Sequence, residues 1–331
     1  MERTYLVTGA AGHLGGEVVR QLLAAGKKVR ALVLPGEKHP PAGADVYEGD
    51  VRQKESLAPC FEGLGEGGLA VIHCAGIISI TSAFRQEVYD VNVLGTRNVA
   101  ELCLAHPGTR LAYISSVHAI PEEPKGQVTR EVREFTPERV EGHYARSKAE
   151  ATAYVLEAAG RGLDALVLHP SGITGPYDPG RGHLTALVTD YCNGSLTAGI
   201  RGGYDFVDVR DVAAGILAAL ERGRSGEPYI LSNRYYQVPE ILALLHRLTG
   251  KKAITRILPL WFARFTAPLS ELYYRILRKP PLYTPYSIYT LQSNSLFSHE
   301  KADRELGYRT RPMEETLKDT IDWLRQEGRI R

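Results

Sequence analysis

The sequence predicts an α/β fold, a doubly wound parallel sheet with helices on both faces, joined to a smaller, mostly helical part. Two observations predict it. Strand-like and helix-like segments alternate through the first half of the chain, as they do in parallel sheets covered on both faces. The first apolar run begins at Thr4 and meets glycines at positions 9, 12 and 15, and residues 17–23 then have helical periodicity.

The elements of the first half follow from this alternation. Further strands are expected at residues 29–34, 45–47, 70–74, 110–114 and 164–168. Helices are expected at residues 88–104 and 144–159. The charged, proline-bearing segment 121–137 is predicted to be a surface loop.

The pattern changes after Pro170, where glycines and prolines cluster. A helix is expected at 184–193 and a strand at 206–209, and Asp211 is predicted to cap a helix at 212–222. We therefore expect a dinucleotide-binding domain, residues 1–170 plus about 204–236, and a substrate-binding domain, about 171–203 plus 237–331.

An aromatic-rich segment, residues 257–290, contains an apolar stripe at helical spacing, interrupted by Pro268. The stripe consists of Trp261, Phe265, Leu269, Leu272 and Ile276. Three interpretations stay open for this segment: core, a lid over an apolar substrate, or a membrane-surface contact.

Composition excludes several classes of protein. The 331 residues include 40 Lys and Arg against 38 Asp and Glu, so no nucleic-acid surface is expected. Four widely spaced cysteines without a C-x-x-C pair are typical of free thiols in a reducing compartment. No signal peptide, no transmembrane segment of about 18 apolar residues and no metal-binding histidine motif is found. We expect a cytoplasmic protein without a metal.

The glycines at 9, 12 and 15 suit a phosphate group. Glycine lets the backbone turn sharply and approach a pyrophosphate, and the N-terminus of the following helix favours an anion. A tight turn without a ligand is the alternative, but the position between the first strand and the first helix favours a dinucleotide.

Tyr144 and Lys148 are four residues apart and lie on one face of a predicted helix. A close ammonium favours the phenolate and lowers the pKa of a tyrosine from about 10 toward a useful range. Ser115 and Ser116 follow a predicted strand at the carboxyl edge of the sheet, where open α/β folds bind ligands. Taken alone, each pattern is also compatible with a solvated helix face or a strand-end cap.

With these parts in order, the sequence resembles the extended short-chain dehydrogenases/reductases, the NAD-dependent epimerase/dehydratase superfamily, over nearly its whole length. The resembling motifs are TGAAGHLG at 8–15, GDV at 49–51, HCAG at 73–76, DVNVLGT at 90–96, Ser115-Ser116, Tyr144-x-x-x-Lys148 and HPSGITGP at 169–176. The resemblance implies a Rossmann fold, a nicotinamide dinucleotide, a small-molecule substrate and a homodimer.

The resemblance also implies roles for individual residues. Catalytic roles fall on Ser116, Tyr144, Lys148 and Asn92. In these roles Tyr144 is the general acid/base, Ser116 orients the substrate oxygen, and Lys148 lowers the tyrosine pKa and holds the nicotinamide ribose. Cofactor-binding roles fall on Gly9, Gly12, His13, Leu14, Gly15, Asp50, Val51, Cys74, Ala75, Gly76, Ser115, Tyr144, Lys148 and Pro170.

Two departures from the family pattern bear on the substrate. Relatives that act on nucleotide sugars carry arginines where this chain has 169–172 (HPSG) and 204–206 (YDF), and Tyr204 cannot supply their charge to a diphosphate. The chain is more similar to dihydroflavonol-reductase-like and 3β-hydroxysteroid-dehydrogenase-like members, which implies an apolar substrate.

The choice between NAD and NADP stays open. The second strand ends in Val33-Leu34, without the acid typical of NAD binders or the arginine typical of NADP binders. Arg30, Lys38 and His39 are candidates for contact with a 2′-phosphate, with ordinary surface charges as the favoured interpretation. The expectation is a slight preference for NADP.

We therefore expect an NAD(P)-dependent oxidoreductase that transfers a hydride between nicotinamide and a carbonyl or secondary alcohol of an apolar small molecule. One alternative is a nucleotide-sugar or sugar epimerase/dehydratase that recycles its NAD internally. The other is a non-catalytic dinucleotide-binding sensor.

Overall fold

The computed structural model describes residues 3–65, 67–79, 81, 83–180, 182–259, 261 and 285–330. Within these residues the centre of the molecule is a seven-stranded sheet in the order β10-β6-β5-β4-β1-β2-β3. Every pair of neighbouring strands is parallel. The strands are β1 (Thr4–Thr8), β2 (Lys28–Val33), β3 (Asp45–Glu48), β4 (Leu69–His73), β5 (Arg110–Ile114), β6 (Asp164–Pro170) and β10 (Pro228–Leu231).

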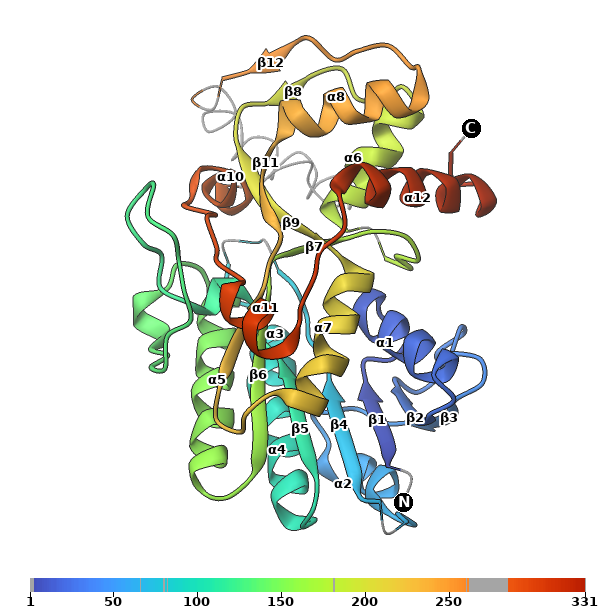
Figure 1. Cartoon of the computed structure of the whole chain (residues 1–331), viewed down its shortest axis with the longest axis vertical. Helices are drawn as coiled ribbons and strands as arrows, with labels where there is room; N and C mark the ends of the chain where they lie inside the picture. The colour runs from blue at the N-terminus through green and yellow to red at the C-terminus, as the bar shows by residue number, and fades with distance from the viewer. Residues whose placement is uncertain are drawn as a thin grey trace.

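Helices cover both faces of this sheet, as Figure 1 shows. One face packs against α1 (His13–Ala24), α7 (Val209–Arg222) and α11 (Glu300–Leu306). The other packs against α2 (Lys54–Leu57), α4 (Thr96–Ala105) and α5 (His143–Gly160). Every residue of β4 is buried, which is the reason that its first four residues, 69–72, are all apolar rather than alternating. The doubly wound fold is confirmed.

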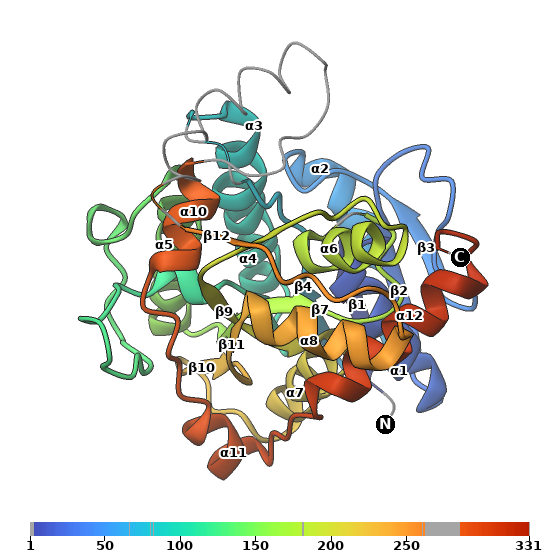
Figure 2. The ribbon, with the colours of Figure 1, turned by 90° about the horizontal axis from the view of Figure 1, so that it is seen from above.

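A smaller part of the molecule lies over the carboxyl ends of the strands (Figures 1 and 2). It contains a three-stranded sheet of β7 (Gly172–Thr174), β9 (Gly203–Asp208) and β11 (Arg234–Gln237), and a pairing of β8 (Gly199–Ile200) with β12 (Ile257–Leu258). Its helices are α6 (His183–Cys192), α8 (Val238–Thr249), α10 (Pro285–Gln292) and α12 (Met313–Gln326). Helices α6, α8 and α12 share an apolar core. The functional cleft is therefore expected between this part and the edge of the large sheet.

Two local expectations differ from the structure. The helix predicted at 88–104 consists of α3 (Gln86–Tyr89), a π-helical segment (Asp90–Gly95) and α4. The prediction that Asp211 caps a helix is wrong, because Asp208 is the cap and its carboxylate accepts the backbone N–H of Arg210 at 2.8 Å. Asp211 lies in the first turn of α7 and pairs with Arg311 at 2.8 Å.

The aromatic stripe of the C-terminal half is mostly outside the described residues. Trp261 is described and is 71% exposed. Phe265, Pro268, Leu269, Leu272 and Ile276 lie outside, so the three interpretations of segment 257–290 stay open. Among the described residues, none of the helices is sufficiently long and apolar to span a bilayer.

Candidate active site

The turn between β1 and α1 is built from glycines that no other residue could replace without strain. Gly9 has φ +66°, and a Cβ on it would lie 2.8 Å from the backbone nitrogen of Ala75. A Cβ on Gly15 would overlap the carbonyl oxygen of Gly9. The strand, the turn and the helix therefore approach one another more closely than side chains allow.

The start of α1 can accept an anion. Gly12 precedes the helix in an extended conformation, and no side chain caps the free N–H groups of the first turn. No acidic residue lies in that turn. Free N–H groups beside a glycine turn fit the pyrophosphate of a dinucleotide. Leu14 points into the core, and His13 bonds through Nε2 to the carbonyl oxygen of Pro176 at 2.9 Å.

The pair predicted beside the adenine follows β3. The carboxylate of Asp50 is held by Arg52, with 2.6 Å between Oδ2 and Nη2, and this hydrogen bond lowers the pKa of Asp50. Val51 is buried, and its carbonyl oxygen accepts the side-chain amide of Asn98 at 2.8 Å. The pair is thus fixed at the carboxyl edge next to β2.

Gly76, Asn92 and Lys148 meet beyond the end of β4. A Cβ on Gly76 would lie 3.2 Å from Oδ1 of Asn92 and 3.3 Å from Nζ of Lys148. The Asn92 amide bonds both backbone groups of Ile77, at 2.8 and 3.0 Å, and donates to the hydroxyl of Ser147 at 3.1 Å. That hydroxyl donates to the carbonyl oxygen of Tyr144 at 2.7 Å, so Asn92 ties the π-helical segment to the start of α5.

Tyr144 and Lys148 occupy the first two turns of α5 and are both buried. Burial raises the pKa of the Tyr144 phenol to about 12, opposite to the lowering expected from Lys148, and a hydrogen bond with the hydroxyl of Ser116 acts against this rise. Burial lowers the pKa of the Lys148 ammonium to about 8. Nζ of Lys148 donates to the carbonyl oxygen of Ile114 at 2.8 Å, which directs the ammonium to the end of β5.

The remaining predicted residues line the carboxyl edge of the sheet. The hydroxyl of Ser115 bonds that of Thr152 at 2.7 Å, whereas Ser116 accepts the backbone N–H of His118 at 3.2 Å. Cys74 and Ala75 follow β4, and burial raises the pKa of the Cys74 thiol to about 12, so it is an inert thiol. Pro170 ends β6 and pairs with Leu231 of β10.

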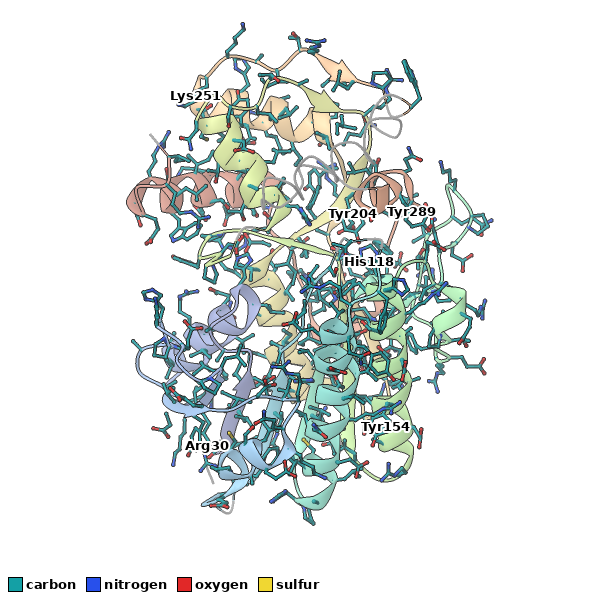
Figure 3. The ribbon with its side chains drawn as sticks, turned by 180° about the vertical axis from the view of Figure 1, so that it is seen from behind. Arg30, His118, Tyr154, Tyr204, Lys251 and Tyr289 are labelled. Atoms are coloured by element: carbon teal, nitrogen blue, oxygen red, sulfur yellow. The ribbon has the colours of Figure 1, made fainter. Side chains whose placement is uncertain are left out.

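Sequence reasoning missed an aromatic pair beside Tyr144. The imidazole of His118 packs edge-on against the Tyr144 ring, with 6.2 Å between centroids, and stacks on Tyr204 of β9 at 5.6 Å. Its Nε2 lies 2.9 Å from the Tyr204 oxygen. Burial lowers the pKa of His118 to about 4, so the ring is neutral. Figure 3 shows His118 and Tyr204 together with Tyr289. The position of His118 two residues after Ser116 was the available signal.

A cavity of about 240 Å³ lies against this aromatic pair. Its lining is mixed: apolar and aromatic side chains such as Val117, Ile120 and Phe297 alternate with polar ones. The charged side chains in the lining are Glu122, Glu138, Arg139 and Glu141. A larger groove, about 580 Å³, lies at α8 and the start of α12 and contains none of the predicted site residues.

Arg30 cannot contact a cofactor phosphate, which corrects one of the sequence-based candidates. Its guanidinium is buried and donates to the carbonyl oxygens of Cys60 and Glu62 at 2.8 and 2.7 Å. Figure 3 places it far from His118. Leu34, directly after β2, is 60% exposed, and Lys38 and His39 lie in the exposed loop that follows.

All four cysteines are free, and three of them are buried. In the described part of the chain no group of three or more His, Cys, Asp or Glu side chains is arranged to hold a metal ion.

Comparison with known proteins assigns the family. The pattern of the NAD dependent epimerase/dehydratase family matches residues 5–232. Sterol demethylase protein B of Methylococcus capsulatus is 32% identical over 99% of this chain and 100% of its own length. The 3 beta-hydroxysteroid dehydrogenase type 7 of Homo sapiens is 32% identical over 92% of this chain and 90% of its own length.

A solved structure agrees with this assignment. The crystal structure of gox2253 superposes with a TM-score of 0.83 at 30% identity and covers 99% of both chains. The chain therefore belongs to the NAD-dependent epimerase/dehydratase family, the extended short-chain dehydrogenases/reductases. It is an enzyme of the dehydrogenase/reductase type, and it has oxidoreductases among its relatives.

Proposed function

We propose that the protein is an NAD(P)-dependent oxidoreductase that interconverts a carbonyl and a secondary alcohol on an apolar, ring-bearing small molecule. The observation that carries this proposal is that Ser116, Tyr144 and Lys148 lie together at the carboxyl edge of the large sheet. The glycine turn between β1 and α1 lies at the same edge. The names of two relatives, a sterol demethylase protein and a hydroxysteroid dehydrogenase, support a sterol-like substrate class.

Each residue has a chemical task in the reductive direction. A nicotinamide dinucleotide held by the glycine turn and Lys148 would supply the hydride for the carbonyl carbon. Tyr144 donates the proton from its phenol to the carbonyl oxygen, and its pKa of about 12 keeps that proton available at neutral pH. The Ser116 hydroxyl, whose oxygen accepts the N–H of His118, donates a hydrogen bond to the same oxygen.

Lys148 has two tasks in this proposal. Its ammonium donates to the carbonyl oxygen of Ile114 and would hold the ribose of a bound dinucleotide. It also stabilises the phenolate that forms when Tyr144 has given up its proton. In the oxidative direction the phenolate must exist before reaction, so oxidation is expected to be faster at alkaline pH than at neutral pH.

An apolar substrate agrees with the groups beside Tyr144. A nucleotide sugar carries a diphosphate, and arginine is the residue best suited to bind it. The positions of those arginines here hold Tyr204, stacked on a neutral imidazole, and His169, which is buried and whose pKa burial lowers to about 4. An aromatic ring and a neutral imidazole supply no charge to a diphosphate, and they favour a ring system.

The test is a reductase assay with cyclohexanone, decalone and a ketosteroid, each with NADH and with NADPH. We expect loss of the reduced-nicotinamide absorbance with the larger ketones, and the ratio of kcat/KM for the two dinucleotides decides the cofactor. We lean toward NADPH, since no acidic residue ends β2. Conversion of UDP-glucose without net change in this absorbance would establish the epimerase alternative instead.

A further inference from the structure

Residues 175–180, which we call the strap, follow β7 and run along α1. The imidazole of His13, the first residue of α1, bonds the carbonyl oxygen of Pro176 at 2.9 Å. Two turns further along this helix, the guanidinium carbon of Arg20 lies 3.9 Å from the centre of the Tyr177 ring. The strap therefore lies against the helix whose first turn receives the pyrophosphate in the proposed function.

The opposite side of the strap is held by α12 and the residues that follow it. Arg329 donates to the carbonyl oxygens of Asp178 and Gly180 at 2.9 and 3.4 Å. Its guanidinium also lies 5.0 Å from the centre of the Trp323 ring. Trp323 in turn meets Tyr177 edge-on, with 6.2 Å between ring centroids. Tyr177 is thus placed between Arg20 of α1 and Trp323 of α12.

The backbone of the strap is strained at its centre. Tyr177 has φ +67°, which among the described residues is the one positive value outside glycine. An aromatic residue rarely adopts this conformation, and it persists only where its surroundings impose it. The carboxylate of Asp178 fixes the next turn by accepting the N–H groups of Gly180 and Gly182 at 3.0 and 2.8 Å. External contacts, rather than local preference, thus determine the shape of the strap.

We propose that Arg20 and Arg329 hold the strap over the start of α1 and thereby position the bound dinucleotide and slow its release. His13 directly follows Gly12, so the residue that anchors the strap also borders the pyrophosphate turn. When either arginine is lost, the strained backbone at Tyr177 relaxes. The strap then moves away from the glycine turn that it borders. This inference rests on the dinucleotide of the proposed function, and it assigns a positioning role to residues far from the reacting atoms.

The test measures binding and release of NADH and NADPH by fluorescence in Arg329→Ala, Arg20→Gln and the double variant. Each single variant is expected to raise the Kd and the release rate about tenfold, through loss of one to two net hydrogen bonds in Arg329→Ala and of the cation–π contact with Tyr177 in Arg20→Gln. Because both residues act on one strap, the double variant is expected to fall short of the product of the single effects. Arg325→Ala is the matched control, since Arg325 lies in the last turn of α12, four residues before Arg329, and pairs with exposed Asp322.

Unfolding temperatures without added dinucleotide separate a positioning role from a merely structural one. A brace between the two parts of the protein would lower the unfolding temperature of the variants and leave the Kd unchanged, which would overturn the inference. Unchanged Kd and release rate in Arg329→Ala and Arg20→Gln would overturn it as well, with the proposed reaction intact. Failure of the unmodified protein to bind either dinucleotide would overturn both proposals.

Discussion

Nε2 of His118 lies 2.9 Å from the phenol oxygen of Tyr204, and the two rings stack with 5.6 Å between centroids. This contact joins the turn that carries Ser116 to β9 of the smaller sheet. The backbone N–H of His118 donates to the Ser116 oxygen, so the same residue contacts both Tyr204 and the hydroxyl that we propose orients the substrate. Substrate binding and orientation of Ser116 are therefore expected to depend on each other.

Removal of the Tyr204 hydroxyl tests this dependence. Tyr204→Phe keeps the stacked ring and loses the hydrogen bond to His118, so kcat/KM for a large ketone is expected to fall about fivefold, close to one net hydrogen bond. The dinucleotide Kd is expected to stay unchanged. Tyr235→Phe on neighbouring β11, whose side chain does not line the cavity, is the control. An equal loss in both variants would contradict a specific role for the pair.

Asn92 is expected to stabilise the fold as well as the site. Asn92→Ala leaves both backbone groups of Ile77 and the hydroxyl of Ser147 without their buried partner, at a cost of about 3 kcal/mol. Asn98→Ala, which removes one contact to Val51 at a half-buried position, is expected to cost about 1 kcal/mol. Urea denaturation measures both. Equal losses would mean that the network around Asn92 adds nothing beyond a single hydrogen bond.

Lys148 makes the stability of the protein depend on pH. Its pKa is about 8 in the folded protein and 10.5 when unperturbed, so the unfolded chain binds more protons between these values. The free energy of unfolding therefore rises with pH between the two pKa values, about 8 and 10.5. The destabilisation caused by the buried ammonium of Lys148 is fully present below pH 8. Lys148→Met removes the titration. The unfolding free energy of the unmodified protein, relative to this variant, is expected to rise by about 2 kcal/mol from pH 8 to pH 9.5. A difference that is independent of pH would contradict the buried ammonium.

The glycine turn offers a matched pair of substitutions. Gly9→Ala places a Cβ 2.8 Å from the nitrogen of Ala75 in a left-handed backbone conformation, and it is expected to destabilise by about 2 kcal/mol and to weaken dinucleotide binding. Gly16→Ala lies inside α1, where a Cβ would have a 3.4 Å contact with the carbonyl oxygen of Ala10, and is expected to stabilise by about 0.5 kcal/mol. Thermal unfolding and fluorescence titration measure both effects. Similar behaviour of the two variants would exclude a special role for Gly9.

Much of the architecture could be predicted because its signals are local. The strand predicted at 110–114 matches β5, and the helix predicted at 144–159 is α5 within one residue at each end. Apolar runs of this length that alternate with segments of helical periodicity are compatible with few folds other than a parallel sheet covered by helices. Tyr144 and Lys148 could be paired for the same reason, since helical spacing alone places them together.

Features that depend on tertiary contacts could not be predicted. Asp208 and Asp211 are both acidic residues near a helix start, and only the chain path decides that the first caps α7 and the second meets Arg311. Arg30 looks like a surface charge in sequence, but carbonyl oxygens of the segment before β4 bury it. His118 and Tyr204 are 86 residues apart, and no periodicity joins them. The homodimer, the cytoplasmic location and the exact domain boundaries stay predictions.

The most direct test of the proposed reaction is the activity of Tyr144→Phe. The change removes one buried phenol oxygen and leaves the ring against His118, so the fold and the dinucleotide site are expected to be retained. We predict that NADH and NADPH bind with unchanged Kd, while ketone reduction falls at least about a thousandfold because the proton donor is lost. Turnover equal to that of the unmodified protein, with the dinucleotide bound, would show that Tyr144 is not the acid and would contradict the account.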